Sequence, residues 1–180
     1  MKVAVLGKVD QKGLSFLKEN EFKFIEIENF ETQNLKEQLK DVDGILLRTT
    51  KLDKEILEHC DNLKIISRHG VGYDNVDLDF LNENKIALCI TSTSNAVSVA
   101  EHVLSFFIYL TKKLSLSDSL VKEGNFEKRS ELPNFFELYK KTVLIIGFGR
   151  IGKEVAKRCL GFDMEVYVYD PFLDLSLIHI

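Results

Sequence analysis

The sequence predicts an α/β protein built around a parallel sheet. Short runs rich in aliphatic and β-branched residues alternate with segments whose apolar residues recur at helical spacing. Most of the strand-like runs are continuously apolar, as strands covered on both faces must be. In addition, a turn with three glycines follows a late strand and opens a helix, which is how many α/β proteins bind phosphate groups.

Residues 1–94 are expected to form one compact α/β unit, because five strands are separated by four helices and this alternation favours a parallel sheet. The predicted strands are Val3–Leu6, Phe24–Ile27, Ile45–Leu47, Lys64–Ser67 and Ala87–Ile90, and the predicted helices are Leu14–Glu19, Asn34–Lys40, Lys54–His59 and Leu78–Asn82.

A longer helix is predicted to follow the polar residues 91–95. Ser98 and Glu101 have the spacing of a capping box, in which the two residues satisfy each other's free backbone donors. Apolar residues then recur every three or four positions from Val99 to Leu110, which predicts one buried stripe.

The boundary between two domains is placed between Ser94 and Lys113. Residues 1–94 would form the first domain, residues 95–112 an interdomain helix, and residues 113–180 the start of a second domain. Within the second domain, the segment Ser115–Pro133 is polar, and we interpret it as a connection to the next strand.

A dinucleotide-binding turn is predicted after the buried strand Thr142–Ile146, where residues 147–152 read GFGRIG and a helical pattern follows. Gly147 would permit the tight turn, Gly149 would let the backbone approach a pyrophosphate, and Gly152 would let the helix pack close to the strand. The helix N-terminus would offer free N–H donors and partial positive charge to the phosphates.

An acidic residue supports this interpretation, because the second strand, Glu165–Tyr169, ends in Asp170, about 20 residues beyond the glycines. A carboxylate at this place accepts hydrogen bonds from the adenosine ribose hydroxyls. The same charge would repel a 2′-phosphate, and no arginine follows in residues 171–173, so NAD is expected rather than NADP. A glycine turn without a ligand is the alternative.

A second glycine loop, residues 67–77 (SRHGVGYDNVD), also follows a buried strand, but Asn75 stands where a dinucleotide turn needs its third glycine. Two glycines beside Arg68 and His69 can turn several N–H groups inward as an anion nest suited to a carboxylate. An ordinary turn is the alternative.

Arg48 also follows a strand end, where it would meet an anionic group such as a phosphate or form a surface ion pair.

Three motifs in this order and spacing resemble the D-2-hydroxyacid dehydrogenase family: residues 67–77, residues 95–102 (NAVSVAEH), and the glycine turn with Asp170. Residues 48–51 (RTTK) and the second glycine loop are most similar to the phosphoglycerate dehydrogenases of that family. The resemblance implies an NAD-dependent oxidoreductase acting on the CH–OH group of a 2-hydroxy acid, with 3-phosphoglycerate, in serine biosynthesis, as the best candidate. It also implies a flavodoxin-like substrate domain followed by the first βαβ of a Rossmann NAD-binding domain.

The resemblance assigns roles to individual residues. The expected substrate-binding residues are Arg48, Arg68, His69, Gly70, Val71 and Gly72, and the expected cofactor-binding residues are Gly147, Gly149, Arg150, Ile151, Gly152 and Asp170. The backbone of residues 70–72 would hold the substrate carboxylate. His69 is interpreted as a side chain that lines the substrate site, with a role as general acid or base as the alternative.

The family's catalytic arginine, glutamate and histidine belong downstream of the first βαβ of the dinucleotide domain. A complete domain has two βαβαβ halves, and only the first strand, helix and second strand occur here. We therefore expect the catalytic residues to be absent and this fragment to be inactive. Residues 175–180 do not resemble the family's continuation and suggest an artificial end.

Composition narrows the function classes further. A net charge of −4 without a basic stripe argues against nucleic acid as a partner. No apolar run is long enough for a signal peptide or a membrane span, so a cytoplasmic location is expected. The three cysteines are expected to be buried reduced thiols, and no group of residues has metal-binding spacing.

The expected partners are a small 2-hydroxy or 2-oxo acid and, in the full-length protein, a second copy of the chain in a homodimer. Two alternatives remain open. One is a non-catalytic NADH-binding protein of the same fold, similar to the dehydrogenase-like co-repressors. The other is a non-functional remnant.

Overall fold

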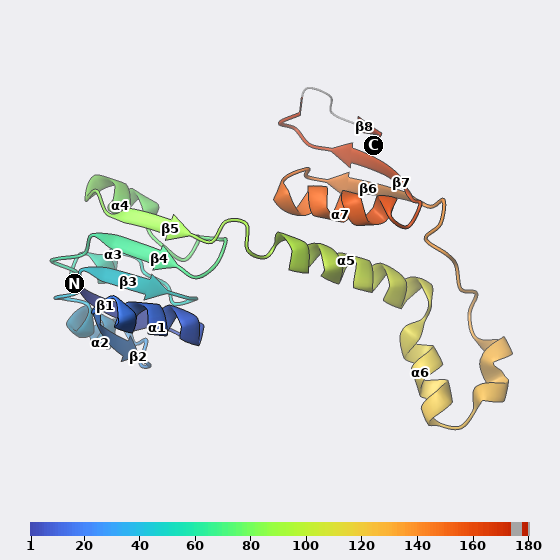
Figure 1. Ribbon diagram of the computed structural model, residues 1–180, viewed down its shortest axis with the longest axis horizontal. Helices are drawn as coiled ribbons and strands as arrows, with labels where there is room; N and C mark the ends of the chain where they lie inside the picture. The colour runs from blue at the N-terminus through green and yellow to red at the C-terminus, as the bar shows by residue number, and fades with distance from the viewer. Residues whose placement is uncertain (174–177, 180) are drawn as a thin grey trace. The chain divides into compact units, whose positions relative to one another are not determined.

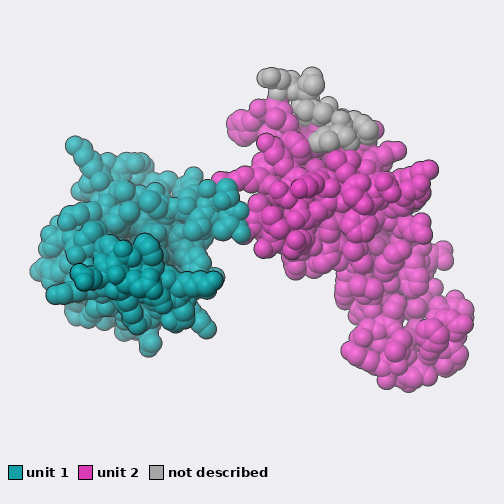
Figure 2. All heavy atoms as spheres, in the orientation of Figure 1, with its two compact units in different colours: residues 1–94 teal, residues 95–180 magenta. Residues whose placement is uncertain are grey.

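The computed structural model describes residues 1–173 and 178–179. The chain divides into two compact units, residues 1–94 (unit 1) and residues 95–180 (unit 2), shown in different colours in Figure 2. Each unit has its own hydrophobic core. The predicted parallel α/β architecture is confirmed, because every strand pair of unit 1 and the pair β6–β7 of unit 2 are parallel.

Unit 1 is a five-stranded sheet in the flavodoxin-like order β2-β1-β3-β4-β5 (Figure 1). Its elements are β1 (Lys2–Leu6), α1 (Gln11–Glu19), β2 (Lys23–Ile27), α2 (Thr32–Gln38), β3 (Gly44–Leu47), α3 (Lys54–Leu57), β4 (Ile65–Arg68), α4 (Leu78–Glu83) and β5 (Ala87–Ile90). Strand order reverses between β1 and β3. Ligands of open α/β sheets bind beyond the carboxyl ends of the strands at such a switch point.

The central strands of unit 1 form most of its core, and Leu6 of β1 and Leu47 of β3 are fully buried. The edge strands β2 and β5 are only partly covered, so the predicted burial on both faces holds for the centre of the sheet alone. The expectation that all three cysteines are buried is wrong for Cys89, which is exposed because it lies in the edge strand β5. Cys60 and Cys159 are buried.

Unit 2 contains the predicted strand, helix and strand, namely β6 (Thr142–Ile146), α7 (Arg150–Leu160) and β7 (Glu165–Tyr169). A short strand, β8 (Ile178–His179), pairs antiparallel with β7. Residues 170–177 alone connect these two strands, which is fewer than the dozen or so residues that a parallel crossover needs. The rest of the tail singled out in the sequence, residues 175–177 and 180, lies outside the described residues.

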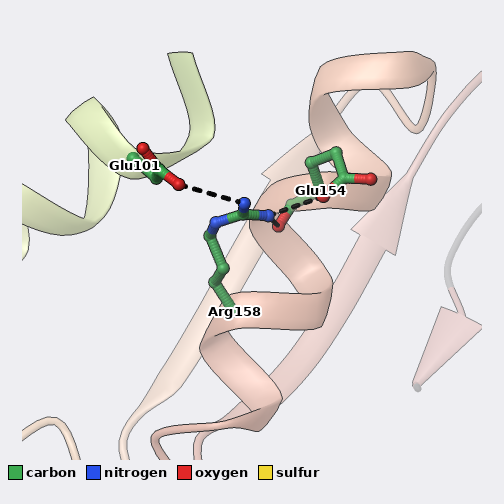
Figure 3. A network of polar contacts seen from close by, with 3 residues as sticks. All are labelled: Glu101, Glu154 and Arg158. Carbon is green, nitrogen blue, oxygen red and sulfur yellow. Dashed lines mark hydrogen bonds and ion pairs between the residues drawn. The ribbon is translucent and has the colours of Figure 1, made fainter. Parts of the chain in front are cut away.

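Helix α5 (Ala96–Thr111) packs beside α7 in unit 2 (Figure 1). The predicted capping box is wrong, because the helix begins at Ala96 and Ser98 lies inside its first turn. The carboxylate of Glu101 instead pairs with Arg158 of α7 across 3.5 Å, and Arg158 also binds Glu154 at 2.6 Å (Figure 3).

In residues 1–173 and 178–179, no helix is long and apolar enough to cross a membrane.

The segment Ser115–Pro133 is not the simple connection that its polarity suggests. It forms most of α6 (Leu114–Lys122) and the 3-10 helix η1 (Phe126–Glu131). Helix α6 ends in a Schellman motif, in which Gly124 has a φ of +70° and the N–H of Asn125 donates to the carbonyl of Leu120 at 2.9 Å. Serines between the leucines of α6 hide its periodicity, and no residue of this helix is buried.

Candidate functional site

The carboxyl ends of β1, β3 and β4 bring three polar side chains to one edge of the unit 1 sheet. Lys8, Arg48 and His69 follow these strands, whose parallel register continues into the loops. The N–H of Arg48 donates to the carbonyl of Leu6 at 3.0 Å, and the N–H of His69 donates to that of Leu47 at 2.7 Å. Since adjacent strands are about 4.8 Å apart, the three residues lie in neighbouring positions along the edge.

A cleft of about 520 Å³ opens at this edge, and we call it the unit 1 cleft. It is lined by Lys8, Val9, Asp10, Arg48, Thr49 and His69. Among the described residues, neither Lys8 nor Arg48 forms an ion pair with a carboxylate. The carboxylate of Asp10 caps helix α1 by accepting a hydrogen bond from the N–H of Lys12 at 2.8 Å. With the carboxylate of Asp10 counted, the cleft lining keeps an excess of one positive charge, and this excess suits an anionic ligand.

The shape of the cleft depends on Gly7, which the sequence reasoning did not single out. Its φ is +94°, a conformation that glycine adopts without strain. A Cβ atom at this position would lie 3.0 Å from the Cβ of Arg48. The Arg48 guanidinium in turn donates to the carbonyl of Lys8 at 3.4 Å. Sequence reasoning also missed Lys8, and the signal that could have found it is a glycine-lysine pair directly after the first strand.

The loop after β4 does not form the anion nest that its glycines suggest, because neither Gly70 nor Gly72 has a positive φ. The side chain of Arg68 folds over Gly70 and occupies the space that a Cβ would need. The N–H of Gly70 donates to the carbonyl of Arg68 at 2.9 Å. The N–H groups of Val71 and Gly72 meet no acceptor among the described residues, so they remain available to a carboxylate.

Asn75, which departs from a dinucleotide motif, fastens this loop to the neighbouring one. Its side-chain amide donates to the carbonyl of Thr50 at 2.8 Å, and its own carbonyl accepts from the N–H of Leu52 at 2.8 Å. The loop that carries Val71 and the loop that carries Arg48 are therefore held together, so unit 1 brings the predicted substrate residues to one edge of its sheet.

The glycine turn after β6 has the local geometry that the motif predicts. Gly147 has a φ of +93°, and a Cβ on Gly152 would collide with the carbonyl oxygen of Gly147. A Cβ on Gly149 would meet no atom within 4 Å, so open space lies beside it. Arg150 and Ile151 are exposed in the first turn of α7, where backbone N–H groups have no intrahelical acceptor.

Asp170 lies at the end of β7, next to this turn. Its Oδ2 accepts a hydrogen bond from the N–H of Phe148 at 2.7 Å, and its Oδ1 accepts one from the N–H of Phe172 at 2.9 Å. These two bonds, the first above all, hold the pKa of the Asp170 carboxyl below its usual value. The carboxylate is therefore charged at neutral pH, as an acceptor for ribose hydroxyls must be.

Comparisons with known proteins agree with these features. Residues 3–167 match the sequence profile of "D-isomer specific 2-hydroxyacid dehydrogenase, catalytic domain". Over 174 residues the chain is 33% identical to the D-3-phosphoglycerate dehydrogenase of Archaeoglobus fulgidus, covering 96% of this chain and 33% of that protein. Over 171 residues it is 35% identical to the hydroxypyruvate reductase of Thermotoga maritima, covering 94% and 55% of the two chains.

One solved structure that the fold resembles is the NAD complex of an NAD-dependent formate dehydrogenase from Staphylococcus aureus. The TM-score is 0.81 at 31% identity, and the match covers 96% of this chain and 57% of that one. The chain thus spans between one third and somewhat more than half of the length of these proteins.

Proposed function

Because the chain belongs to the D-isomer-specific 2-hydroxyacid dehydrogenase family, we propose that it serves the NAD-dependent oxidation of the CH–OH group of a 2-hydroxy acid, or the reverse reduction. The observation that carries this proposal is the glycine turn with Asp170 beside it. A dinucleotide needs a turn that binds its pyrophosphate and a charged acceptor for its ribose hydroxyls. In a dinucleotide fold these two features lie at the ends of adjacent parallel strands.

The residues of unit 2 fit NAD. The open space beside Gly149 would admit the pyrophosphate, and the free N–H groups at Arg150 and Ile151 would face it. Asp170 would accept hydrogen bonds from the ribose and oppose a 2′-phosphate, which favours NAD over NADP. When bound, the nicotinamide would supply the hydride chemistry, while the protein supplies orientation and charge.

Unit 1 would bind the acid. The N–H groups of Val71 and Gly72 would hold the substrate carboxylate, and His69 would line the unit 1 cleft as a binding side chain. Arg48, which has no ion-pair partner among the described residues, would bind a phosphate group. The name of the Archaeoglobus relative supports 3-phosphoglycerate as the substrate, which would place the reaction in serine biosynthesis.

We further propose that residues 1–94 are the N-terminal part of a substrate domain, residues 95–112 an interdomain helix, and residues 113–180 the start of the NAD-binding domain. The arginine, glutamate and histidine that perform the chemistry would lie outside these 180 residues. The full-length protein would act as a cytoplasmic homodimer, whereas this chain alone would have no dehydrogenase activity.

The test is an assay of the full-length gene product for NADH formation with 3-phosphoglycerate, together with NADH titration. Turnover with this acid is the expected result. Tight NADH binding without oxidation of any 2-hydroxy acid would overturn the enzymatic proposal and support a non-catalytic NADH-binding protein of the same fold.

A further inference from the structure

We infer that Lys8 is a specificity-determining residue, which together with Arg48 forms a two-cation subsite for a dianionic group at the end of the substrate opposite its carboxylate. The ligand class is a 2-hydroxy or 2-oxo acid that carries a phosphate monoester. This inference rests on the proposed function and names the chemical feature that selects its substrate.

The backbone positions Lys8 for this role. Strand β1 ends at Leu6, and the positive φ of Gly7 turns the chain so that Lys8 lines the unit 1 cleft together with Arg48. The Arg48 guanidinium donates to the carbonyl of Lys8 across 3.4 Å. A hydrogen bond from the side chain of Arg48 to the backbone of Lys8 therefore links the two cationic residues.

The two positive charges at this end of the cleft face a single carboxylate among the lining residues, that of Asp10. Lys8 and Arg48 form no ion pair within the described part of the chain, and Asp10 is engaged in capping helix α1. A neighbouring cleft of about 370 Å³, which Lys8 also borders, contains Glu26 and Glu28, but Lys8 pairs with neither. An arginine fork beside a compact ammonium suits a phosphate dianion better than a single carboxylate.

The sheet separates this subsite from the groups that would hold the carboxylate. Lys8 follows β1, Arg48 follows β3, and the free N–H groups of Val71 and Gly72 follow β4. With strands about 4.8 Å apart, Lys8 lies roughly two strand spacings from the carboxylate end. A substrate with anionic groups at both ends would span this edge, whereas an acid with one carboxylate would leave Lys8 without a ligand.

The experiment compares 3-phosphoglycerate with glycerate, which differ only in the phosphate group. Their dissociation constants are measured by calorimetry or NMR titration on the full-length protein, in which unit 1 contains all the residues that line the cleft. We expect the wild type to prefer 3-phosphoglycerate. Lys8→Met should reduce this preference by roughly tenfold or more, because it removes one charge-assisted hydrogen bond. Lys8→Arg should retain most of it.

Lys12→Met is the matched control, since Lys12 is a nearby exposed lysine that does not line the cleft. Circular dichroism checks that each variant is folded. An unchanged preference in Lys8→Met, or an equal loss in Lys12→Met, would overturn the role of Lys8 and leave the proposed function intact. Failure of the wild type to bind either acid, while NADH still binds, would instead count against the substrate site itself.

Discussion

The backbone N–H of Phe148 donates a hydrogen bond to the carboxylate of Asp170 across 2.7 Å, and so ties the glycine turn after β6 to the end of β7. The residue expected to receive the ribose therefore also holds the turn expected to receive the pyrophosphate. Its second oxygen is engaged by the N–H of Phe172 at 2.9 Å. Loss of this carboxylate would affect both contacts of a dinucleotide at once.

Replacing Asp170 with Ala should weaken NADH binding and narrow the preference of the full-length protein for NADH over NADPH. NADH affinity should fall because a ribose acceptor is lost and the N–H of Phe148 is released, while NADPH is relieved of a repulsive charge. Fluorescence titration with both cofactors measures this. Asp41→Ala, at an exposed position in unit 1, should leave both constants unchanged. Equal affinities of the wild type for the two cofactors would show that Asp170 does not select between NADH and NADPH.

Substitutions at two glycines of the same turn should have opposite consequences. Gly149→Val should leave unit 2 folded and abolish NADH binding, because its side chain would enter open space that the pyrophosphate needs. Gly152→Val should instead destabilise the fold by about 1–3 kcal/mol or more, since even its Cβ would collide with the carbonyl of Gly147. Thermal unfolding and NADH titration separate the two effects. Undiminished NADH affinity in Gly149→Val would refute the phosphate-turn assignment.

Asp43 should contribute to acid unfolding. The ammonium of Lys64 at 2.7 Å, followed by the N–H of Lys2 at 2.8 Å, lowers the pKa of Asp43 below its usual value of 3.8. A carboxyl whose pKa is depressed by folding stabilises the protein above the unfolded value, and this stability disappears as pH falls from about 3.8 through the folded pKa. Asp43→Asn should therefore lower the melting temperature at pH 7 and make it less sensitive to pH below 4.

The matched control for this experiment is Asp61→Asn, because Asp61 is exposed and forms no ion pair within the described residues. Its melting curve should follow that of the wild type across the same range. If Asp43→Asn and the wild type lose stability in parallel between pH 4 and pH 2, the pairing of Asp43 with Lys64 has no energetic role.

The 180-residue chain alone should aggregate and show no dehydrogenase activity. Leu144 and Ile146 of β6 are 55% and 77% exposed, and Phe172 is 95% exposed, so apolar surface lies beside an open strand edge. Light scattering and an assay of NADH oxidation with 2-oxo acids provide the measurement. Leu144→Lys combined with Ile146→Lys should reduce scattering. A monodisperse, active chain would show that the catalytic groups lie within it, with His69 as the first candidate.

Sequence reasoning succeeds here where the determinants are local. The glycine turn, the strands beside it and Asp170 are encoded within about 30 consecutive residues, in the strand-turn-helix pattern of a dinucleotide fold, and their positions in the structure agree with that pattern. The central strands of unit 1 can be predicted from the sequence equally well, because a strand that is buried on both faces needs a continuous apolar run.

It fails where residue spacing alone does not fix the local backbone or the neighbouring side chain. The capping box at Ser98 has the right spacing, but the helix begins at Ala96 and the carboxylate of Glu101 pairs with Arg158 of α7. The predicted nest does not form, because neither Gly70 nor Gly72 has a positive φ and the side chain of Arg68 folds over Gly70. Lys8 lies beside Arg48 only because β1 and β3 are neighbours in the sheet, and forty residues of sequence separate the two.

The division of the chain at Ser94 and Asn95 also affects how the protein can change over evolutionary time. Every residue that lines the unit 1 cleft precedes this point, and the whole glycine turn with Asp170 follows it. Under the proposed function, the residues that select the acid and those that select the dinucleotide would be encoded in separate stretches of the gene. Recombination at this junction would then exchange one specificity and preserve the other, and point mutations in unit 1 would change the acid without affecting cofactor recognition.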